Sequence, residues 1–143
     1  MKTTGYSKTS LAKKLGIKDN FNIRIINAPE YYFKLFSDLP IHLEINANRA
    51  GKKDFIHYFE TSAETLNSTL PKLKKEIQPN GIIWISWYKK SAKKDTDITE
   101  DIIRDIALKN SMVDIKVCAI DEIWSGLKLV IRLKDRILKD GKL

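Results

Sequence analysis

Hydrophobic and polar positions along the chain predict short strands that alternate with helices. Apolar runs rich in β-branched and aromatic residues, which are typical of strands, occupy 22–28, 41–46, 54–60, 82–87, 113–120 and 127–133. Between most of these runs, apolar residues recur every three or four positions, which is the spacing of a helix that buries one face. This order favours an α/β fold built on a mostly parallel sheet.

Two helices are expected in the first third of the chain. The segment 10–16 has helical spacing and stops at Gly16, a residue suited to the end of a helix. A second helix is predicted to begin at Pro29, because proline is well tolerated at the first helical position. Its buried face would carry Tyr32, Phe33 and Phe36.

A longer helix is predicted after the strand 54–60. Thr61 and Glu64 have the spacing of a capping box at its start. Pro71 predicts a kink or a restart inside this helix, and the Pro-Asn-Gly run 79–81 predicts a turn after it. The apolar residues at helical spacing are Leu66, Leu70, Leu73 and Ile77.

The strand 82–87 is a nearly unbroken apolar run, as expected for a central parallel strand that is covered on both faces. The last helix is predicted to follow it, with Asp97 and Glu100 as capping residues. Its buried face would carry Ile102, Ile103 and Ile106.

The last two strands are predicted to form an antiparallel hairpin around 121–126. Lys128 and Arg132 would face outward, and the core-facing residues would be Leu127, Leu129, Ile131 and Leu133. The direction of 41–46 stays open, because no helix follows it and 47–53 spans at most about 25 Å. This strand is therefore parallel, antiparallel or shifted in register.

These elements predict a single three-layer, Rossmann-like α/β domain over residues 1–143. Its sheet would have about six strands, mostly parallel, and would be closed by the C-terminal antiparallel hairpin. Residues 1–20 would form an N-terminal extension with a short helix. Residues 134–143 would form a charged tail that could be a short helix.

The composition narrows the expected compartment and partners. The formal net charge is +8, with more lysines than arginines, and the lysines are scattered along the chain; the charge therefore allows nucleic-acid binding without favouring it. Cys118, the single cysteine, lies in an apolar stretch and is expected to be a buried, inert thiol. No apolar run reaches the length of a membrane span and no secretory signal is visible, so we expect a cytoplasmic protein without a membrane partner.

Several segments resemble known proteins. The strand 54–59, the run 77–84 (IQPNGIIW) and the closing hairpin resemble a shortened class I methyltransferase fold that lacks one helix–strand unit. More closely, the chain is similar to an uncharacterised bacterial family of unknown function, in Gly5-Tyr-Ser, 11–17, Thr96-Asp, Glu100-Asp, 113–118 and 124–132. This similarity implies a methyltransferase-like, Rossmann-like fold and a bacterial source, but it implies no activity.

The turn after the first strand lacks the signature of a nucleotide-binding loop. In Rossmann-like enzymes this turn is rich in glycine, whereas here 26–31 reads Ile-Asn-Ala-Pro-Glu-Tyr. Pro29 has no N–H to donate, and Glu30 places negative charge where a phosphate would bind. We therefore expect no dinucleotide and assign no cofactor, although S-adenosylmethionine carries no phosphate and is not excluded by Glu30. Glu44 or Asn46 could contact a ribose, but an exposed edge position is the favoured interpretation.

A candidate ligand site lies where the strand 82–87 ends. Aromatic and charged side chains follow this strand, and the hairpin turn is expected to reach the same edge of the sheet. Indole rings beside lysines and carboxylates could hold an anionic or aromatic small molecule, or a protein partner. The predicted contact residues are Trp87, Lys89, Lys90, Asp121, Glu122, Trp124 and Ser125.

Catalytic and metal-binding patterns are absent from the sequence. His42 and His57 are the only histidines, and with one cysteine they form no recognisable metal site. His57 is expected to be a hydrogen-bonded structural residue. These observations predict a non-catalytic, Rossmann-like binding or regulatory domain. The alternatives are a divergent S-adenosylmethionine-dependent methyltransferase and a nucleic-acid-binding protein.

Overall fold

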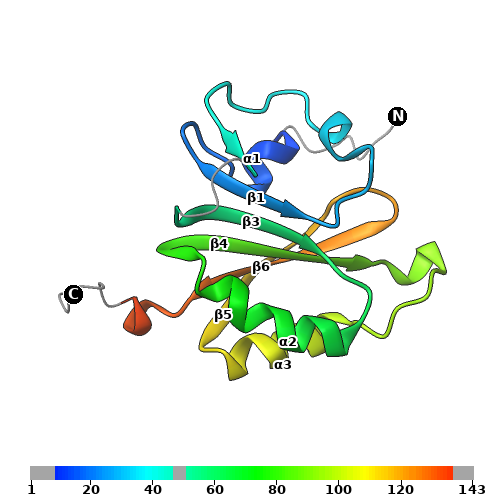
Figure 1. The fold of residues 1–143 in the computed structure, drawn as a ribbon. Helices are drawn as coiled ribbons and strands as arrows, with labels where there is room; N and C mark the ends of the chain where they lie inside the picture. Colours follow the sequence, from blue (N-terminus) through cyan, green and yellow to red (C-terminus); the bar gives the residue numbers. More distant parts are fainter. Residues whose placement is uncertain (1–8, 47–50, 137–143) are drawn as a thin grey trace.

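The computed structural model of the chain describes residues 9–46 and 51–136, and these residues form three layers around one sheet. Figure 1 shows helices α2 (Ala63–Lys74) and α3 (Glu100–Lys109) below the sheet and α1 (Leu11–Leu15) above it. Three short 3-10 turns, η2 (Tyr32–Leu35), η3 (Lys90–Ala92) and η4 (Leu133–Asp135), complete the helical elements of the described residues. The predicted three-layer α/β domain is confirmed.

Six strands lie in the order β2-β1-β3-β4-β6-β5. The first four are parallel, and β6 and β5 are antiparallel to their neighbours, as the predicted closing hairpin requires. The strands are β1 (Asn22–Ile26), β2 (Glu44–Ile45), β3 (Lys53–Phe59), β4 (Ile77–Tyr88), β5 (Met112–Ala119) and β6 (Trp124–Ile131).

The sheet separates two apolar clusters, because successive side chains of a strand point to opposite faces. The cluster under α2 and α3 takes alternate residues of β4, among them Ile83, Ile85 and Trp87. The cluster under α1 contains Trp84, which stands between Ile83 and Ile85 on β4 and points to the opposite face. The prediction that this strand is central and covered on both faces is therefore confirmed.

The second strand is parallel to β1, and it is only two residues long. Asn22 pairs with Glu44 and Ile23 with Ile45, so most of the predicted strand 41–46 is irregular. A strand this short rises only about 7 Å. Because β2 pairs only with the start of β1, the end of β2 lies close to the level at which β3 begins, and an antiparallel arrangement is not needed.

The helix predicted at Pro29 is wrong. Only η2 forms, with Tyr32 buried at 2% exposure and Phe33 half exposed at 50%. Aromatic residues are modest helix formers, and Pro40 stands close behind them. The Tyr32 ring instead makes edge contacts with Phe36, and with His57 and Phe59 of β3, so tertiary packing determines the conformation of this segment.

Helix α2 begins one residue later than predicted. The Ser62 hydroxyl, rather than that of Thr61, accepts the N–H of Thr65 at 3.2 Å. The helix contains Pro71 and ends at Lys74, and Ile77 begins β4 instead of closing the helix. The predicted buried positions Leu66, Leu70 and Leu73 are confirmed.

The Pro-Asn-Gly run predicted as a turn lies inside β4. Between the pairs Lys53–Ile77 and Phe55–Ile82, two steps along β3 match five along β4, so β4 bulges there. A Cβ on Gly81 would lie 2.8 Å from the Ile77 Cβ. Glycine is therefore required by this close approach, and the turn signal marks an irregular strand.

Asp97 caps a different helix from the one predicted. Thr99 is the N-cap of α3, and its hydroxyl accepts the N–H of Ile102 at 3.2 Å. The Asp97 carboxylate instead accepts the N–H of Ala63 at 2.7 Å, at the start of α2. Asp97 therefore ties the loop before α3 to the first turn of α2.

The C-terminal hairpin is confirmed except at its end and at Lys128, which is half-buried beside α1 instead of facing outward. Leu127, Leu129 and Ile131 are buried, but Leu133 is 79% exposed because β6 ends at Ile131. Of the predicted tail, residues 134–136 are described and contribute only to η4, while 137–143 lie outside the described residues, as do 1–8 at the start of the chain. Within the described ranges, no helix is both long and apolar enough to cross a membrane.

Candidate functional site

A cleft of about 490 Å³ opens at the carboxyl edge of the parallel strands. This edge is where ligands bind in open α/β sheets. Three loops and the β5–β6 turn meet there, because β1, β3 and β4 all end at the same edge. The cleft is lined by Asn27, Pro29, Tyr31, Phe59, Glu60, Thr61, Tyr88, Lys94, Ile123 and Trp124.

Asn27, directly after β1, has the left-handed conformation that glycine would otherwise provide. Its φ is +60°, and its side-chain amide donates to the Phe59 carbonyl at 3.2 Å. Asparagine is among the few residues other than glycine that adopt this conformation readily. The missing glycine therefore does not remove the sharp turn, and the asparagine was the signal in the sequence that could have predicted it.

The segment after this turn offers no α-helical N-terminus to the cleft. The only helical element there is η2, which follows Pro29 and begins at Tyr32. A phosphate bound at this position would lack the free N–H groups that a helix supplies. This geometry agrees with the expectation that the site does not suit a dinucleotide.

Tyr88 and Trp124 form an aromatic wall of the cleft. They are cross-strand partners on β4 and β6, and their ring centroids lie 4.3 Å apart at 32°. Trp124 is 8% exposed and meets Phe59 edge-on at 4.9 Å. The Lys94 ammonium lies 5.9 Å from the centre of the Tyr88 ring, so the wall borders a positive charge.

Trp87 does not join Trp124 in this wall. It pairs with Ser125 in the sheet and packs into the cluster under α2 and α3, on the opposite face. The expectation that the two tryptophans share one surface is therefore corrected, because consecutive strand residues face opposite sides. The alternation of Trp84, Ser86 and Tyr88 would have assigned Tyr88 to the cleft.

Tyr31 and Asp121 join the loop after β1 to the β5–β6 turn. The Tyr31 hydroxyl donates to Asp121 Oδ2 at 2.7 Å. Asp121 Oδ1 accepts the N–H groups of Ile123 and Trp124, each at 2.8 Å. Burial, followed by the hydrogen bond to this carboxylate, raises the pKa of Tyr31 to about 12, so the phenol stays a neutral donor.

Glu60 places a carboxylate in the cleft at the end of β3. One of its oxygens accepts the N–H groups of Thr61 and Ser62, each at 3.0 Å, and the other accepts the Tyr58 hydroxyl. Burial, with this hydrogen bond as a second cause, raises the pKa of Tyr58. The carboxylate is therefore held in place beside the turn at Asn27, and the oxygen that accepts the Tyr58 hydroxyl has one lone pair left for a ligand.

The other predicted contact residues surround the cleft without lining it. Lys89 donates its N–H to the Ile123 carbonyl at 2.8 Å, and Lys90 begins η3. Glu122 is exposed, and Ser125 is half-buried in β6. Of the predicted set, only Trp124 lines the cleft, so a binding role for the others stays a prediction.

The residues considered for a ribose contact occupy the far edge of the sheet. Asn46 Oδ1 accepts the N–H of Ile25 at 2.8 Å, and Asn46 has a φ of +54°. Glu44 is exposed on β2. Asn46 therefore has a structural role at the end of β2, and neither residue lines the cleft.

His57 belongs to a buried polar chain behind the cleft. Its Nδ1 shares a hydrogen bond of 2.8 Å with the Tyr32 hydroxyl, and its Nε2 one of 2.8 Å with the Ser86 hydroxyl. Burial lowers the pKa of His57 to about 3, so the ring is neutral at ordinary pH. The prediction of a structural histidine is confirmed. Cys118 is buried as predicted, and burial raises the pKa of its thiol.

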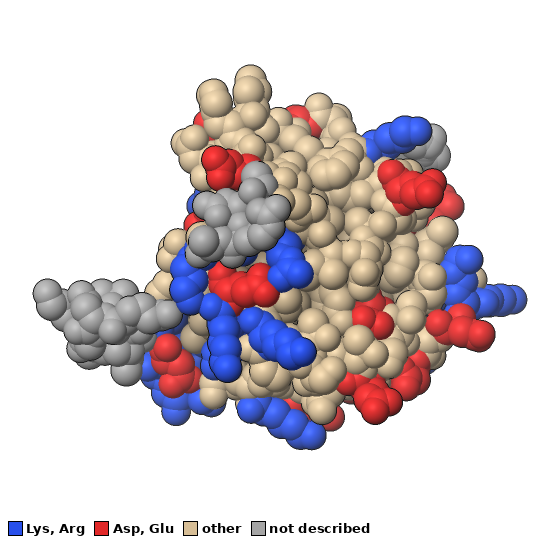
Figure 2. Space-filling view, in the orientation of Figure 1, with Lys and Arg blue, Asp and Glu red and all other residues tan. Residues whose placement is uncertain are grey.

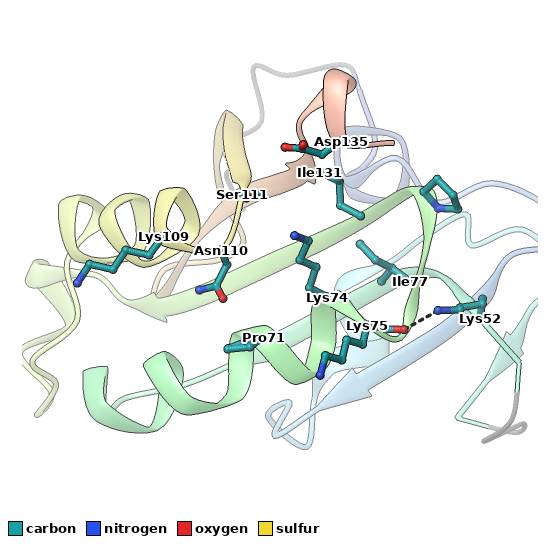
Figure 3. Close-up of a pocket in the computed structure, with 11 residues that line it drawn as sticks. Lys52, Pro71, Lys74, Lys75, Ile77, Lys109, Asn110, Ser111, Ile131 and Asp135 are labelled. Atoms are coloured by element: carbon teal, nitrogen blue, oxygen red, sulfur yellow. Dashed lines mark hydrogen bonds between the residues drawn. The ribbon is translucent and has the colours of Figure 1, made fainter. Parts of the chain in front are cut away.

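A second cavity, of about 460 Å³, lies at the opposite edge of the sheet (Figure 3). Its lysines include Lys74 and Lys109, in the last turns of α2 and α3. The Lys52 ammonium donates to the Lys75 carbonyl at 2.7 Å. Figure 2 shows basic side chains gathered at the same end of α2. Helix dipoles favour cations at these positions, so the fold itself accounts for the basic character of this cavity.

The chain is similar in fold to solved structures of methyltransferases. A methyltransferase from Aquifex aeolicus matches with a TM-score of 0.54 and 15% identity, over 84% of this chain and 87% of its own. The ribosomal protein L11 methylase from Lactobacillus delbrueckii subsp. bulgaricus matches with the same TM-score and identity, over 84% of this chain and 74% of its own. Magnesium protoporphyrin IX methyltransferase from Synechocystis PCC 6803, with bound S-adenosylmethionine, matches with a TM-score of 0.54 and 10% identity. The match covers 85% of this chain and 74% of that protein.

These matches confirm the methyltransferase-like scaffold and correct the functional prediction. No protein family and no curated protein matches the chain. At these identities the likeness to solved structures concerns the fold. The prediction of a non-catalytic binding or regulatory domain is nevertheless less well supported than the methyltransferase alternative. These solved structures of similar fold are methyltransferases, and one of them contains bound S-adenosylmethionine. The prediction of a non-catalytic domain depended on the absence of glycine after the first strand, and Asn27 provides the left-handed conformation there instead.

Proposed function

We propose that the chain is an S-adenosylmethionine-dependent methyltransferase whose methyl donor binds in the cleft at the ends of β1 and β3. The observation that carries this proposal is the left-handed turn at Asn27, which opens the cleft where the fold presents its ligand site. The likeness to methyltransferases supports the choice of ligand. The volume of about 490 Å³ also lies in the usual range for small-molecule sites.

The side chains of the cleft suit the chemistry of this donor. S-adenosylmethionine has a sulfonium and an ammonium group but no phosphate, so it does not need the α-helical N-terminus that is missing after Pro29. The Glu60 carboxylate would attract the positive groups. The Tyr88–Trp124 wall would pack against the flat adenine, and the Lys94 ammonium, which also lines the cleft, would attract the carboxylate of the donor. When bound, the donor supplies an electrophilic methyl group.

The residues of the chain would bind and orient the reactants. Tyr31 and Asp121 join two loops across the cleft and would help to exclude water from it. His57 would not act as a base, because it lies in the core with both nitrogens hydrogen-bonded. The buried single cysteine suits a reducing compartment, and we place the enzyme in the cytoplasm of a bacterial cell.

Calorimetric titration with S-adenosylmethionine and S-adenosylhomocysteine tests this proposal. We expect saturable binding of both. In Glu60→Gln, binding of S-adenosylmethionine should weaken about tenfold or more, and by more than binding of S-adenosylhomocysteine, because only the former carries a sulfonium that the lost negative charge would attract. Glu122→Gln is the matched control, since Glu122 is exposed and does not line the cleft. Absence of heat with the wild-type chain at high micromolar ligand would overturn the proposal.

A further inference from the structure

Two lysines face each other across the β5–β6 hairpin. Lys116 pairs directly with Lys128 in the sheet register, on the face that carries α1. Side chains in such pairs have Cβ atoms about 5 Å apart, and like charges in this position destabilise a sheet. The hairpin therefore keeps a pair of residues that destabilises it. Such local conflicts between sequence and fold are typical of functional sites.

Further lysines from other elements join this pair. The Lys116 ammonium donates to the Lys14 carbonyl of α1 at 3.1 Å. Lys128 lies beside Gly16, the C-cap of α1, and burial together with the charges of Lys116 and Lys18 lowers its pKa. Among the described residues, no ion pair joins Lys14, Lys18, Lys116 or Lys128 to a carboxylate.

The charged group extends to the rim of the cleft. Lys116 and Cys118 lie on the same face of β5, and Lys116 contacts α1 at Lys14. Burial raises the pKa of the Cys118 thiol, and the charges of Lys14, Lys116 and Lys89 oppose that rise. Lys89 follows Tyr88 and donates its N–H to the carbonyl of Ile123, a residue that lines the cleft. We call Lys14, Lys18, Lys89, Lys116 and Lys128 the lysine track.

Helix capping does not explain the lysine track. Lys14, Lys116 and Lys128 do lie around the C-terminus of α1, but only the Lys116 ammonium donates to a helix carbonyl, and a helix of five residues has a small dipole. By contrast, Lys74 and Lys109 lie at the ends of longer helices. The charges of the track are balanced best by a ligand with several negative charges along its length.

We propose that the methyl acceptor is a single-stranded nucleic acid, whose phosphates bind the lysine track while a base stacks on the Tyr88–Trp124 wall. Successive phosphates of the nucleic acid would neutralise the opposed lysines in turn. An unpaired base offers the flat face that aromatic side chains bind, whereas a duplex keeps its bases stacked. The role as acceptor rests on the proposed methyltransferase function, but the binding does not.

Fluorescence anisotropy with short labelled single strands of RNA and DNA, at several salt concentrations, tests the proposal. For the double variant Lys116→Gln/Lys128→Gln, the slope of log K against log salt should become shallower by about 1.4, which is about 0.7 for each lost phosphate contact. The control Lys74→Gln/Lys109→Gln makes the same change of charge at the opposite edge and should bind like wild type. Tyr88→Ala should weaken binding about tenfold and leave the salt slope unchanged.

Several outcomes would overturn the inference. These are no saturable binding by wild type at low salt, equal weakening in the two double variants, or tighter binding of a duplex or of polyglutamate than of the single strands. Thermal unfolding checks folding, since removal of the opposed charges should leave the Tm of Lys116→Gln/Lys128→Gln unchanged or raise it. If nucleic acid binds as expected and S-adenosylmethionine does not, the lysine track stands and the methyltransferase proposal falls.

Discussion

The Tyr31 hydroxyl donates to the Asp121 carboxylate across a sequence separation of 90 residues. This contact fixes the loop after β1 against the β5–β6 turn, and both segments border the cleft. The same carboxylate closes its own turn through two backbone N–H groups. One side chain therefore shapes the hairpin turn and positions the opposite wall of the proposed binding site.

Tyr31→Phe should lower the free energy of unfolding by about 1.5 kcal/mol or more, because it removes one hydrogen bond to a charged carboxylate. A double-mutant cycle with Asp121→Asn isolates the pair, since asparagine keeps an acceptor for the two backbone N–H groups. Urea unfolding gives the coupling energy. Additive effects of the two changes would show that the contact contributes nothing to stability.

Asn27→Gly and Asn27→Ala should differ, although both remove the side-chain amide. Glycine adopts a φ of +60° without strain, whereas alanine in this conformation is destabilised by about 1 kcal/mol or more. We expect Asn27→Gly to bind S-adenosylmethionine nearly as tightly as wild type and Asn27→Ala to bind more weakly. Calorimetry on both variants decides, and equal affinities would show that the turn does not shape the site.

The stability of the protein should fall in acid partly because of His57. Its pKa of about 3 lies below the ordinary value of about 6.5, so between these pH values the unfolded chain binds a proton that the folded chain excludes. The stabilisation is present above pH 6.5 and is lost as the pH falls toward 3, by up to about 1.4 kcal/mol per pH unit.

Urea unfolding of wild type and of His57→Gln at several pH values measures this contribution. The variant should lack the part of the slope that belongs to His57, and parallel profiles would contradict its buried, neutral state. If the variant does not fold, NMR of the wild type gives the answer. The ring signals of His57 should then stay constant from pH 7 to about 4.

Asp97→Ala should lower the free energy of unfolding by about 1 kcal/mol, because its carboxylate accepts the first N–H of α2. Hydrogen exchange should rise most in the first turn of α2. Asp95→Ala is the matched control, since Asp95 is exposed and carries the same charge two residues earlier. A similar loss in both variants would point to a general charge effect instead of a cap.

Much of the fold could be predicted because the relevant signals are local. The apolar run 82–87 fits a strand covered on both faces, and the alternation of Leu127, Leu129 and Ile131 fits a strand of the closing hairpin. The stop of α1 at Gly16 likewise depends on one residue, whose φ is +85°. Each feature follows from neighbouring residues and needs no knowledge of distant contacts.

The prediction failed where distant residues compete with a local preference. Pro29 and the aromatic residues after it have helical spacing, but the Tyr32 ring packs on His57 and Phe59, and only a 3-10 turn forms. Asp97 precedes α3 by only a few residues, yet its carboxylate accepts the N–H of Ala63 in α2, and Thr99 caps α3 instead. Such contacts exist only after the strands have paired.

The sequence by itself determined the positions of most strands, most of the helices and the closing hairpin, because hydrophobic periodicity is a property of consecutive residues. Only the tertiary structure decided that Tyr88, and not Trp87, meets Trp124, and that Asn27 turns beside the end of β3. It also brought Lys116 opposite Lys128. These relationships depend on strand register, which is set by packing between elements far apart in the chain.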